Sequence, residues 1–178
     1  VKAINYYASI SRDFPKFREL DRVIFNKAFA QLQIEKEDEA ERSFIELLKK
    51  NKRSRLRPDA FLAIGEINFK RRNFKRALAY FNQVKKYKFA RVYPYGLYKA
   101  GWSYYNLSAY EQAIQELEKV IAFGKNVEAT GGDARLDLRT EALMDLALFY
   151  SGVRSASDAL RYFKAQSGDN DPFPALRK

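Results

Sequence analysis

The sequence from residue 93 to residue 106 reads Tyr93-Pro94-Tyr95-Gly96-Leu97-Tyr98-Lys99-Ala100-Gly101-Trp102-Ser103-Tyr104-Tyr105-Asn106. It contains the only tryptophan and five of the twelve tyrosines of the chain, at spacings that suit a helix. Glycine inside a helix costs about 1 kcal/mol relative to alanine. The pair Ala100-Gly101 therefore indicates a place where another backbone approaches closely.

The pattern around Gly101 recurs along the chain. A small residue follows twelve positions later, and a large apolar residue follows sixteen positions later. The aligned sets are Gly101, Tyr110, Ala113 and Leu117; Gly65, Phe74, Ala77 and Phe81; Ala28, Ala40 and Phe44; and Ala147, Ala159 and Phe163. Each set predicts two amphipathic helices joined by a short polar turn.

This pattern resembles the tetratricopeptide repeat, whose period is about 34 residues. The resemblance implies an all-α fold, a right-handed α-solenoid of antiparallel helix pairs with about nine helices. We expect one array over residues 1–178, with an extra N-terminal helix at 3–11 and an insertion at 124–135. The expected units are 21–54, 58–91, 94–127 and 140–173.

Two features depart from a complete, regular array. In the first unit, Lys27 and Gln31 occupy positions that are usually apolar or aromatic in this family. Neither end has a clear polar capping helix, which such arrays usually need. We therefore expect the sequence to be a fragment of a longer protein.

The composition removes several kinds of chemistry. The chain has no cysteine and no histidine, which excludes disulfides, thiolate nucleophiles, imidazole acid–base catalysis and Cys/His zinc sites. The sequence also has no phosphate-binding loop, no nucleophile elbow and no metal-ligand cluster. We expect no enzyme activity, no cofactor and no metal.

The resemblance also implies a binding surface. In tetratricopeptide repeats the first helix of each unit lines a concave face, and the matching positions here are rich in aromatic residues. We expect a concave, partner-binding groove that contains Tyr95, Tyr98, Trp102, Tyr105, Asn106, Phe25, Phe29, Leu62, Glu66, Phe69 and Met144. Rigid tyrosine and tryptophan side chains are over-represented at binding hot spots. The alternative is that some of these side chains pack on neighbouring helices or under the insertion.

One family subtype can be set aside. Repeats that clamp a C-terminal carboxylate use lysine and asparagine at two first-unit positions, which here hold Phe25 and Phe29. We therefore expect the groove to bind an apolar or aromatic segment of another protein.

The net charge of +11 is unevenly distributed. Between Lys49 and Arg91 there are 15 Lys and Arg residues and only two acidic ones. Junctions between units should lie along one edge of a solenoid, and their cations form a predicted basic edge of Lys49, Lys50, Lys52, Arg53, Arg55, Arg57, Lys85, Lys86, Lys88 and Arg91. The cationic turn at 70–76 should lie on the opposite edge. The basic edge could be simply solvated, or bind an acidic protein, nucleic acid or an anionic membrane.

Together these features predict a non-catalytic adaptor or scaffold for protein–protein interaction. The alternative is an electrostatic binder of nucleic acid or anionic membrane through residues 49–91. Segments 97–107 and 139–147 further resemble envelope tetratricopeptide proteins of Gram-negative gliding or predatory bacteria. That resemblance implies a bacterial periplasmic setting and a motility or envelope complex, with the cytoplasm as the alternative location.

Overall fold

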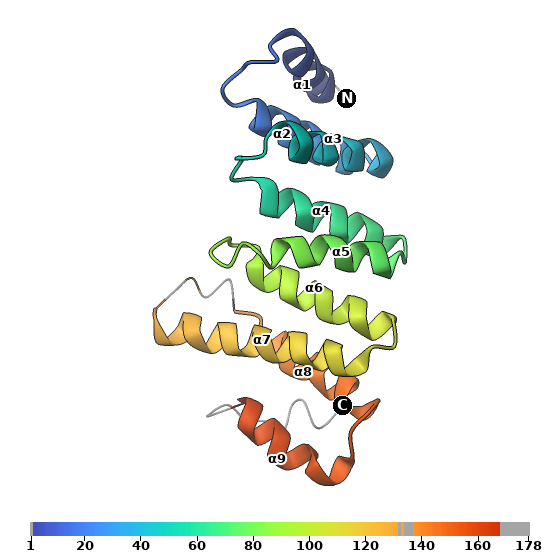
Figure 1. Ribbon diagram of the computed structural model, residues 1–178, viewed down its shortest axis with the longest axis vertical. Coiled ribbons are helices and arrows are strands. Elements are labelled where there is room, and N and C mark those ends of the chain that lie inside the picture. Colours follow the sequence, from blue (N-terminus) through green and yellow to red (C-terminus); the bar gives the residue numbers. More distant parts are fainter. Residues whose placement is uncertain (1, 132, 134–136, 168–178) are drawn as a thin grey trace.

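The computed structural model describes residues 2–131, 133 and 137–167, and this part of the chain forms nine α-helices and no strand (Figure 1). The helices are α1 (Lys2–Asp13), α2 (Leu20–Leu32), α3 (Glu37–Lys50), α4 (Arg57–Lys70), α5 (Phe74–Val84), α6 (Tyr93–Asn106), α7 (Tyr110–Ala129), α8 (Arg139–Ser151) and α9 (Ala156–Ser167). The expected unit end at 168–173, and residues 132 and 134–136 of the expected insertion, lie outside the described residues.

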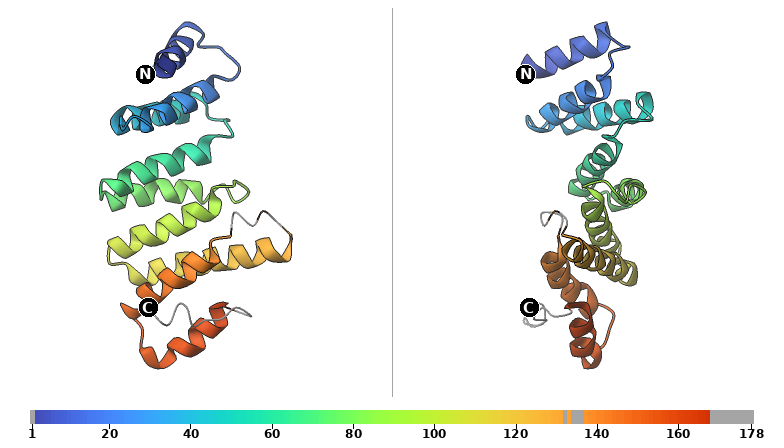
Figure 2. Two further views of the ribbon diagram at one scale, coloured as in Figure 1. Left: turned by 180° about the vertical axis from the view of Figure 1, so that it is seen from behind. Right: turned by 90° about the vertical axis from the view of Figure 1, so that its left-hand side faces the viewer.

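The helices stack as antiparallel pairs along the long axis of the molecule (Figure 1). The pairs are α2 with α3, α4 with α5, and α6 with α7, and each pair packs on the next. The right-hand view of Figure 2 shows the first helices of these pairs in one layer and the second helices in another. α1, which corresponds to the extra helix expected at 3–11, packs against α2. The all-α solenoid predicted from the sequence is confirmed.

The turns inside the first three units have the same geometry. In each, one non-glycine residue is left-handed, and the next N–H donates to the carbonyl five residues earlier, as in a Schellman motif. The left-handed residues are Glu35, Arg72 and Ser108, with φ of 60°, 60° and 59°. This conformation costs a non-glycine residue about 1–2 kcal/mol. Its recurrence shows that helix packing imposes the turn.

The repeated small residues allow the paired helices to approach. Ala28, Ala40, Ala77 and Ala113 are completely buried, together with the large residues four positions after each second-helix alanine. A Cβ atom added at Gly65 would lie 2.4 Å from Cε1 of Phe81, whose ring is fully buried. Glycine at position 65 is therefore required by the aromatic ring that fills the interior of its unit.

The first unit replaces apolar contacts by polar pairs between its two helices. Nζ of Lys27 lies 3.1 Å from Oε2 of Glu46, and the side chain of Lys27 is only 14% exposed. The buried side chain of Gln31 accepts a hydrogen bond of 2.8 Å from the Ser43 hydroxyl. The two positions that depart from the family pattern thus have matching polar partners on α3.

The segment expected as an insertion begins as a helix. α7 continues through residues 124–129 to Ala129, so the first half of the segment lengthens α7. The chain then returns across α7, because a Cβ atom added at Gly124 would meet Asp137 and Arg139. Arg139 donates to both carboxylate oxygens of Asp137. This connection leads into α8.

We predict that alanine lowers the free energy of unfolding to different extents at two aligned glycines, Gly65 and Gly101. Gly65→Ala should lower the free energy of unfolding by about 1–3 kcal/mol, because the new methyl group overlaps the buried ring of Phe81. Gly101→Ala should change it by less, because the nearest atom, Cδ2 of Leu117, is 3.2 Å away on a flexible side chain. Urea denaturation followed by circular dichroism measures both. Equal destabilisation would contradict this account.

Candidate functional site

The expected groove residues all lie on α2, α4, α6 and α8, whose shared surface we call the first-helix face. Four of the eleven have exposed side chains: Phe29, Glu66, Tyr95 and Asn106. The other seven are half-buried. The structure therefore places many of the aromatic residues against neighbouring helices.

Two of the conspicuous aromatic residues of α6 are bound to one carboxylate of α8. The Tyr98 hydroxyl and Nε1 of Trp102 both donate to Oδ2 of Asp145, the latter over 2.9 Å. Burial, followed by this hydrogen bond, raises the pKa of Tyr98 to about 12. The three side chains join the first helices of the third and fourth units.

A second contact between the same helices is aromatic. The ring of Tyr105 stacks on Phe149 at a centroid distance of 4.5 Å and an interplanar angle of 14°. Trp102 meets the same ring edge-on at 5.1 Å. Phe149 is completely buried, and the rings of Trp102 and Tyr105 pack against it. Tyr98, Trp102 and Tyr105 are thus structural contacts in addition to lining the face.

The aromatic residues of the first two units also contact other aromatic rings. Phe25 and Phe29 lie 5.2 Å apart between ring centroids, and both contact the buried ring of Phe44. Phe69 packs edge-on to Phe74 at 5.2 Å. Phe29 nevertheless remains 46% exposed on the first-helix face.

Glu66 is the charged residue at the centre of the face. Its side chain is half exposed, but the surrounding chain desolvates the carboxylate and raises its pKa. Nζ of Lys99 lies 3.9 Å away and opposes this shift. The same ammonium lies over the Phe69 ring, 5.7 Å from its centroid. Lys99 therefore links α4 to α6 along the first-helix face.

A cavity of about 530 Å³ opens between α8 and α9. Its walls include the expected groove residue Met144 and the Asp145 carboxylate that binds Tyr98 and Trp102. The complete lining is Met144, Asp145, Ala147, Leu148, Tyr150, Ser151, Arg154, Ala156, Ala159 and Phe163. Leu148 is 47% exposed there and adds apolar surface to the mouth of this space. We call this space the α8–α9 cavity.

Sequence reasoning missed the role of Asp145 and the α8–α9 cavity. A signal for Asp145 was available, since a carboxylate inside an apolar helix needs hydrogen-bond donors from elsewhere. The cavity had no such signal, because α9 carries the same small and large residues as the other second helices, Ala159 and Phe163.

The positive charges are divided between two edges of the solenoid (Figure 1). The junction edge consists of the loops between units, residues 14–19, 51–56 and 85–92. The turn edge consists of the turns within units, residues 33–36, 71–73 and 107–109. Figure 2 shows the two sets of connections on opposite sides of the molecule.

Three cations on and beside the turn edge, Lys70, Arg71 and Arg76, pair with the acidic start of α3. Arg71 lies 2.8 Å from both Asp38 and Glu41, and Arg76 lies 2.8 Å from Glu41. A hydrogen bond from Lys70 lowers the pKa of Glu37. These pairs connect the first and second units, so the charges at this edge hold the array together.

The ten expected basic-edge residues fall into three groups. Arg57 is structural, because Nη1 donates to the Leu48 carbonyl over 2.7 Å and the guanidinium lies over the Phe61 ring. Acidic side chains pair with Lys50, Lys85 and Arg91. Within the described part of the chain, the rest form no ion pair: Lys49, Lys52, Arg53, Arg55, Lys86 and Lys88.

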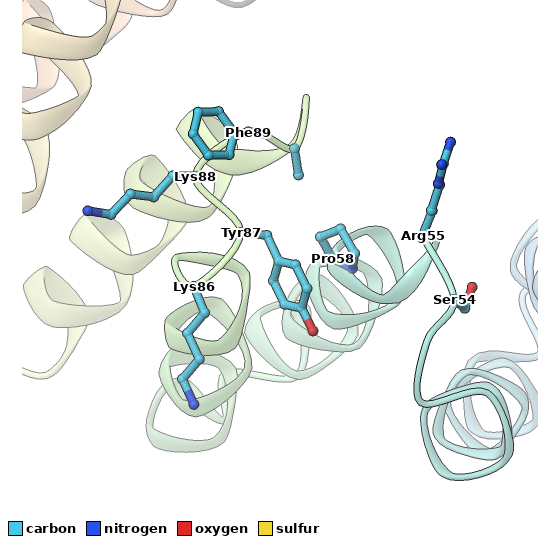
Figure 3. A pocket seen from close by; sticks show the side chains of 8 residues that line it. Ser54, Arg55, Pro58, Lys86, Tyr87, Lys88 and Phe89 are labelled. Carbon is cyan, nitrogen blue, oxygen red and sulfur yellow. The ribbon is translucent and has the colours of Figure 1, made fainter.

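A hollow of about 510 Å³ separates two junction loops, as Figure 3 shows. It is lined by Ser54, Arg55, Pro58, Lys86, Tyr87, Lys88, Phe89 and Ala90. Three of the predicted basic-edge residues, Arg55, Lys86 and Lys88, thus lie at one hollow. Whether this edge binds nucleic acid, membrane or an acidic protein stays a prediction at this point.

Over the described residues, no helix is long and apolar enough to cross a bilayer. The same residues contain no group of three potential carboxylate, cysteine or histidine ligands for a metal ion.

We predict that Tyr98→Phe lowers the free energy of unfolding by about 1.5 kcal/mol, because it removes a hydrogen bond to a charged acceptor. Asp145 keeps its bond from Trp102, so the loss should be smaller than for Asp145→Ala. Chemical denaturation of the two variants tests this order. The reverse order would show that Asp145 does not organise the contact.

The raised pKa of Tyr98 predicts a stability change at alkaline pH. An unfolded tyrosine loses its proton near pH 10, whereas folded Tyr98 keeps it up to about pH 12. Because the unfolded chain then binds fewer protons, the free energy of unfolding should fall as the pH rises from 10 to 12. Tyr98→Phe should reduce this fall. Denaturation on both sides of pH 10 measures it, and an unchanged slope would refute the assignment.

Comparison with known proteins supports the architecture. Residues 59–88 and 95–122 match the tetratricopeptide repeat family model, which places α4, α5, α6 and much of α7 within it. No curated protein matches the chain. Repeats of this family generally serve as non-catalytic scaffolds for protein–protein contacts.

Two crystal structures of MamA have a similar fold. They align with TM-scores of 0.65 and 0.64 at 20% sequence identity. Each alignment covers 92% of this chain, and they cover 84% and 78% of the MamA chains. Two segments of the chain thus match tetratricopeptide repeats, and the chain shares the helical solenoid fold of the MamA structures.

Proposed function

We propose that the chain is a scaffold that holds an apolar segment of a partner protein on its first-helix face. The observation that carries this proposal is the α8–α9 cavity, which opens beside the aromatic residues bound to Asp145. A paired helix that leaves Leu148 exposed has apolar surface available for another chain.

The lining of the α8–α9 cavity suits one large apolar side chain of a partner. Met144, Leu148, Ala159 and Phe163 supply apolar walls. Ser151 and Arg154 add a few polar groups that can orient the partner's backbone. A concave apolar site with few polar groups is the usual composition of a binding pocket. The partner segment therefore anchors here and extends over α6.

The surface next to the cavity is already ordered in the free protein. Asp145 holds Tyr98 and Trp102, and Phe149 supports Trp102 and Tyr105. Side chains that are fixed before binding lose little entropy when the partner arrives. Phe29 and Tyr95, which are more exposed, then make contacts farther along the face.

The setting of this scaffold is a separate part of the proposal. The resemblance of segments 97–107 and 139–147 to bacterial envelope proteins supports an envelope or motility complex. The partner is then another protein of that complex.

We predict that Leu148→Glu abolishes partner capture without loss of helicity, because it puts a charge at the mouth of the α8–α9 cavity. Val153→Glu is the matched control. Val153 is 44% exposed, close to the 47% of Leu148, but it does not line the cavity. Affinity purification from the source organism, followed by mass spectrometry, compares the proteins retained by each variant.

Leu148→Met should keep the same partners, because methionine preserves an apolar mouth of similar volume. The proposal fails if Leu148→Glu retains the partners of the unmodified chain. It also fails if Val153→Glu loses the same partners, since the effect would then reflect added charge alone.

A further inference from the structure

The junction edge combines two features that neither the repeat fold nor the first-helix face explains. Its three loops, 14–19, 51–56 and 85–92, follow one another along one side of the solenoid (Figures 1 and 2). The loops carry exposed cations, and two of them also carry exposed phenylalanines.

The exposed cations are not neutralised by the chain itself. Among the described residues, none of the following seven forms an ion pair: Lys16, Arg18, Lys52, Arg53, Arg55, Lys86 and Lys88. The turn edge is the internal comparison, because there Arg71 and Arg76 meet Asp38 and Glu41. The same chain thus neutralises part of one edge and leaves a row of free positive charge on the other.

The exposed phenylalanines lie beside these cations. The Phe89 side chain is fully exposed and lies between Lys88 and Arg91 in sequence. Figure 3 shows it at the end of its loop, apart from Tyr87 and Pro58. Phe14 is 63% exposed and Phe17 is 47% exposed. The N–H of Phe17 donates to the Phe14 carbonyl over 3.0 Å, so the two phenylalanines belong to the same turn of the chain.

We propose that the junction edge binds the surface of an anionic lipid bilayer. Its cations would meet the negative headgroups, and its phenylalanine rings would enter the boundary between headgroups and acyl chains. Electrostatic attraction and apolar insertion together give the two signals that stable peripheral binding needs. This activity is independent of partner binding on the first-helix face, because the two surfaces share no residue.

The form of the surface favours a bilayer over a folded partner. The phenylalanines project from separate loops of different units, so they can enter a flat, deformable surface at the same time. The hollow of about 510 Å³ between two loops has Arg55, Lys86 and Lys88 at its walls, where a lipid phosphate can be bound. Single-stranded nucleic acid would use the same cations, and it is therefore the competitor in the test.

The test is co-sedimentation of the whole chain with lipid vesicles. Vesicles of phosphatidylcholine mixed with phosphatidylglycerol should bind the protein, and vesicles of phosphatidylcholine alone should not. Binding should weaken as salt is added, because the headgroup contacts are screened. Lys52→Gln/Arg53→Gln should weaken binding about thirtyfold, as expected for two cations at an anionic surface. Phe89→Ala should weaken it about tenfold through lost apolar insertion.

The matched control is Arg72→Gln/Lys75→Gln on and beside the turn edge. It removes the same charge from two exposed residues and should leave vesicle binding within about twofold of the unmodified chain. Leu148→Glu should also bind vesicles normally, which separates this proposal from the scaffold function.

Three results would overturn the proposal. The first is no co-sedimentation with anionic vesicles at low salt. The second is an equal loss of binding in both charge variants, which would show attraction to net charge rather than to this edge. The third is capture of a single-stranded oligonucleotide by the junction edge with no vesicle binding, which would identify the edge as a nucleic-acid site.

Discussion

The close approach of paired helices is the constraint on which the rest of the structure depends. A helix pair of this length cannot enclose a core by itself, so apolar surface is buried only when pairs pack and stack. The approach requires almost no side chain at Gly65, where the buried ring of Phe81 takes up the space. It also forces Glu35, Arg72 and Ser108 into the same left-handed turn. The stacking energy outweighs the local backbone cost.

Stacking also places the connections on two edges, and the charges on these edges have different physical roles. On the turn edge, the buried carboxylate of Glu41 pairs with Arg71 and Arg76, so charge joins neighbouring units. On the junction edge, most cations have no acidic partner in the described chain and only add positive potential. The uneven pairing therefore leaves the solenoid with one surface on which most cations are not neutralised.

On the first-helix face, Asp145 determines the structural role of Tyr98 and Trp102. Tyr98 and Trp102 have the chemistry of binding hot spots, but Asp145 uses their polar atoms to join α6 to α8. These aromatic residues therefore support the binding surface as well as lining it. The apolar surface that we propose for a partner therefore lies at the α8–α9 cavity, where Leu148 is exposed.

The sequence by itself determined the class of fold, because periodic apolar residues and small residues at matching positions depend on local helix geometry and helix pairing. It also located the cationic loops and most residues of the first-helix face. Only the tertiary structure decided which charges are neutralised, that Asp145 binds two aromatic residues and that a cavity separates α8 from α9. These features depend on contacts between residues that are far apart in sequence, such as Arg71 with Asp38 and Trp102 with Asp145. A repeat pattern specifies that units stack, and the individual side chains that meet across each interface decide what the stack can bind.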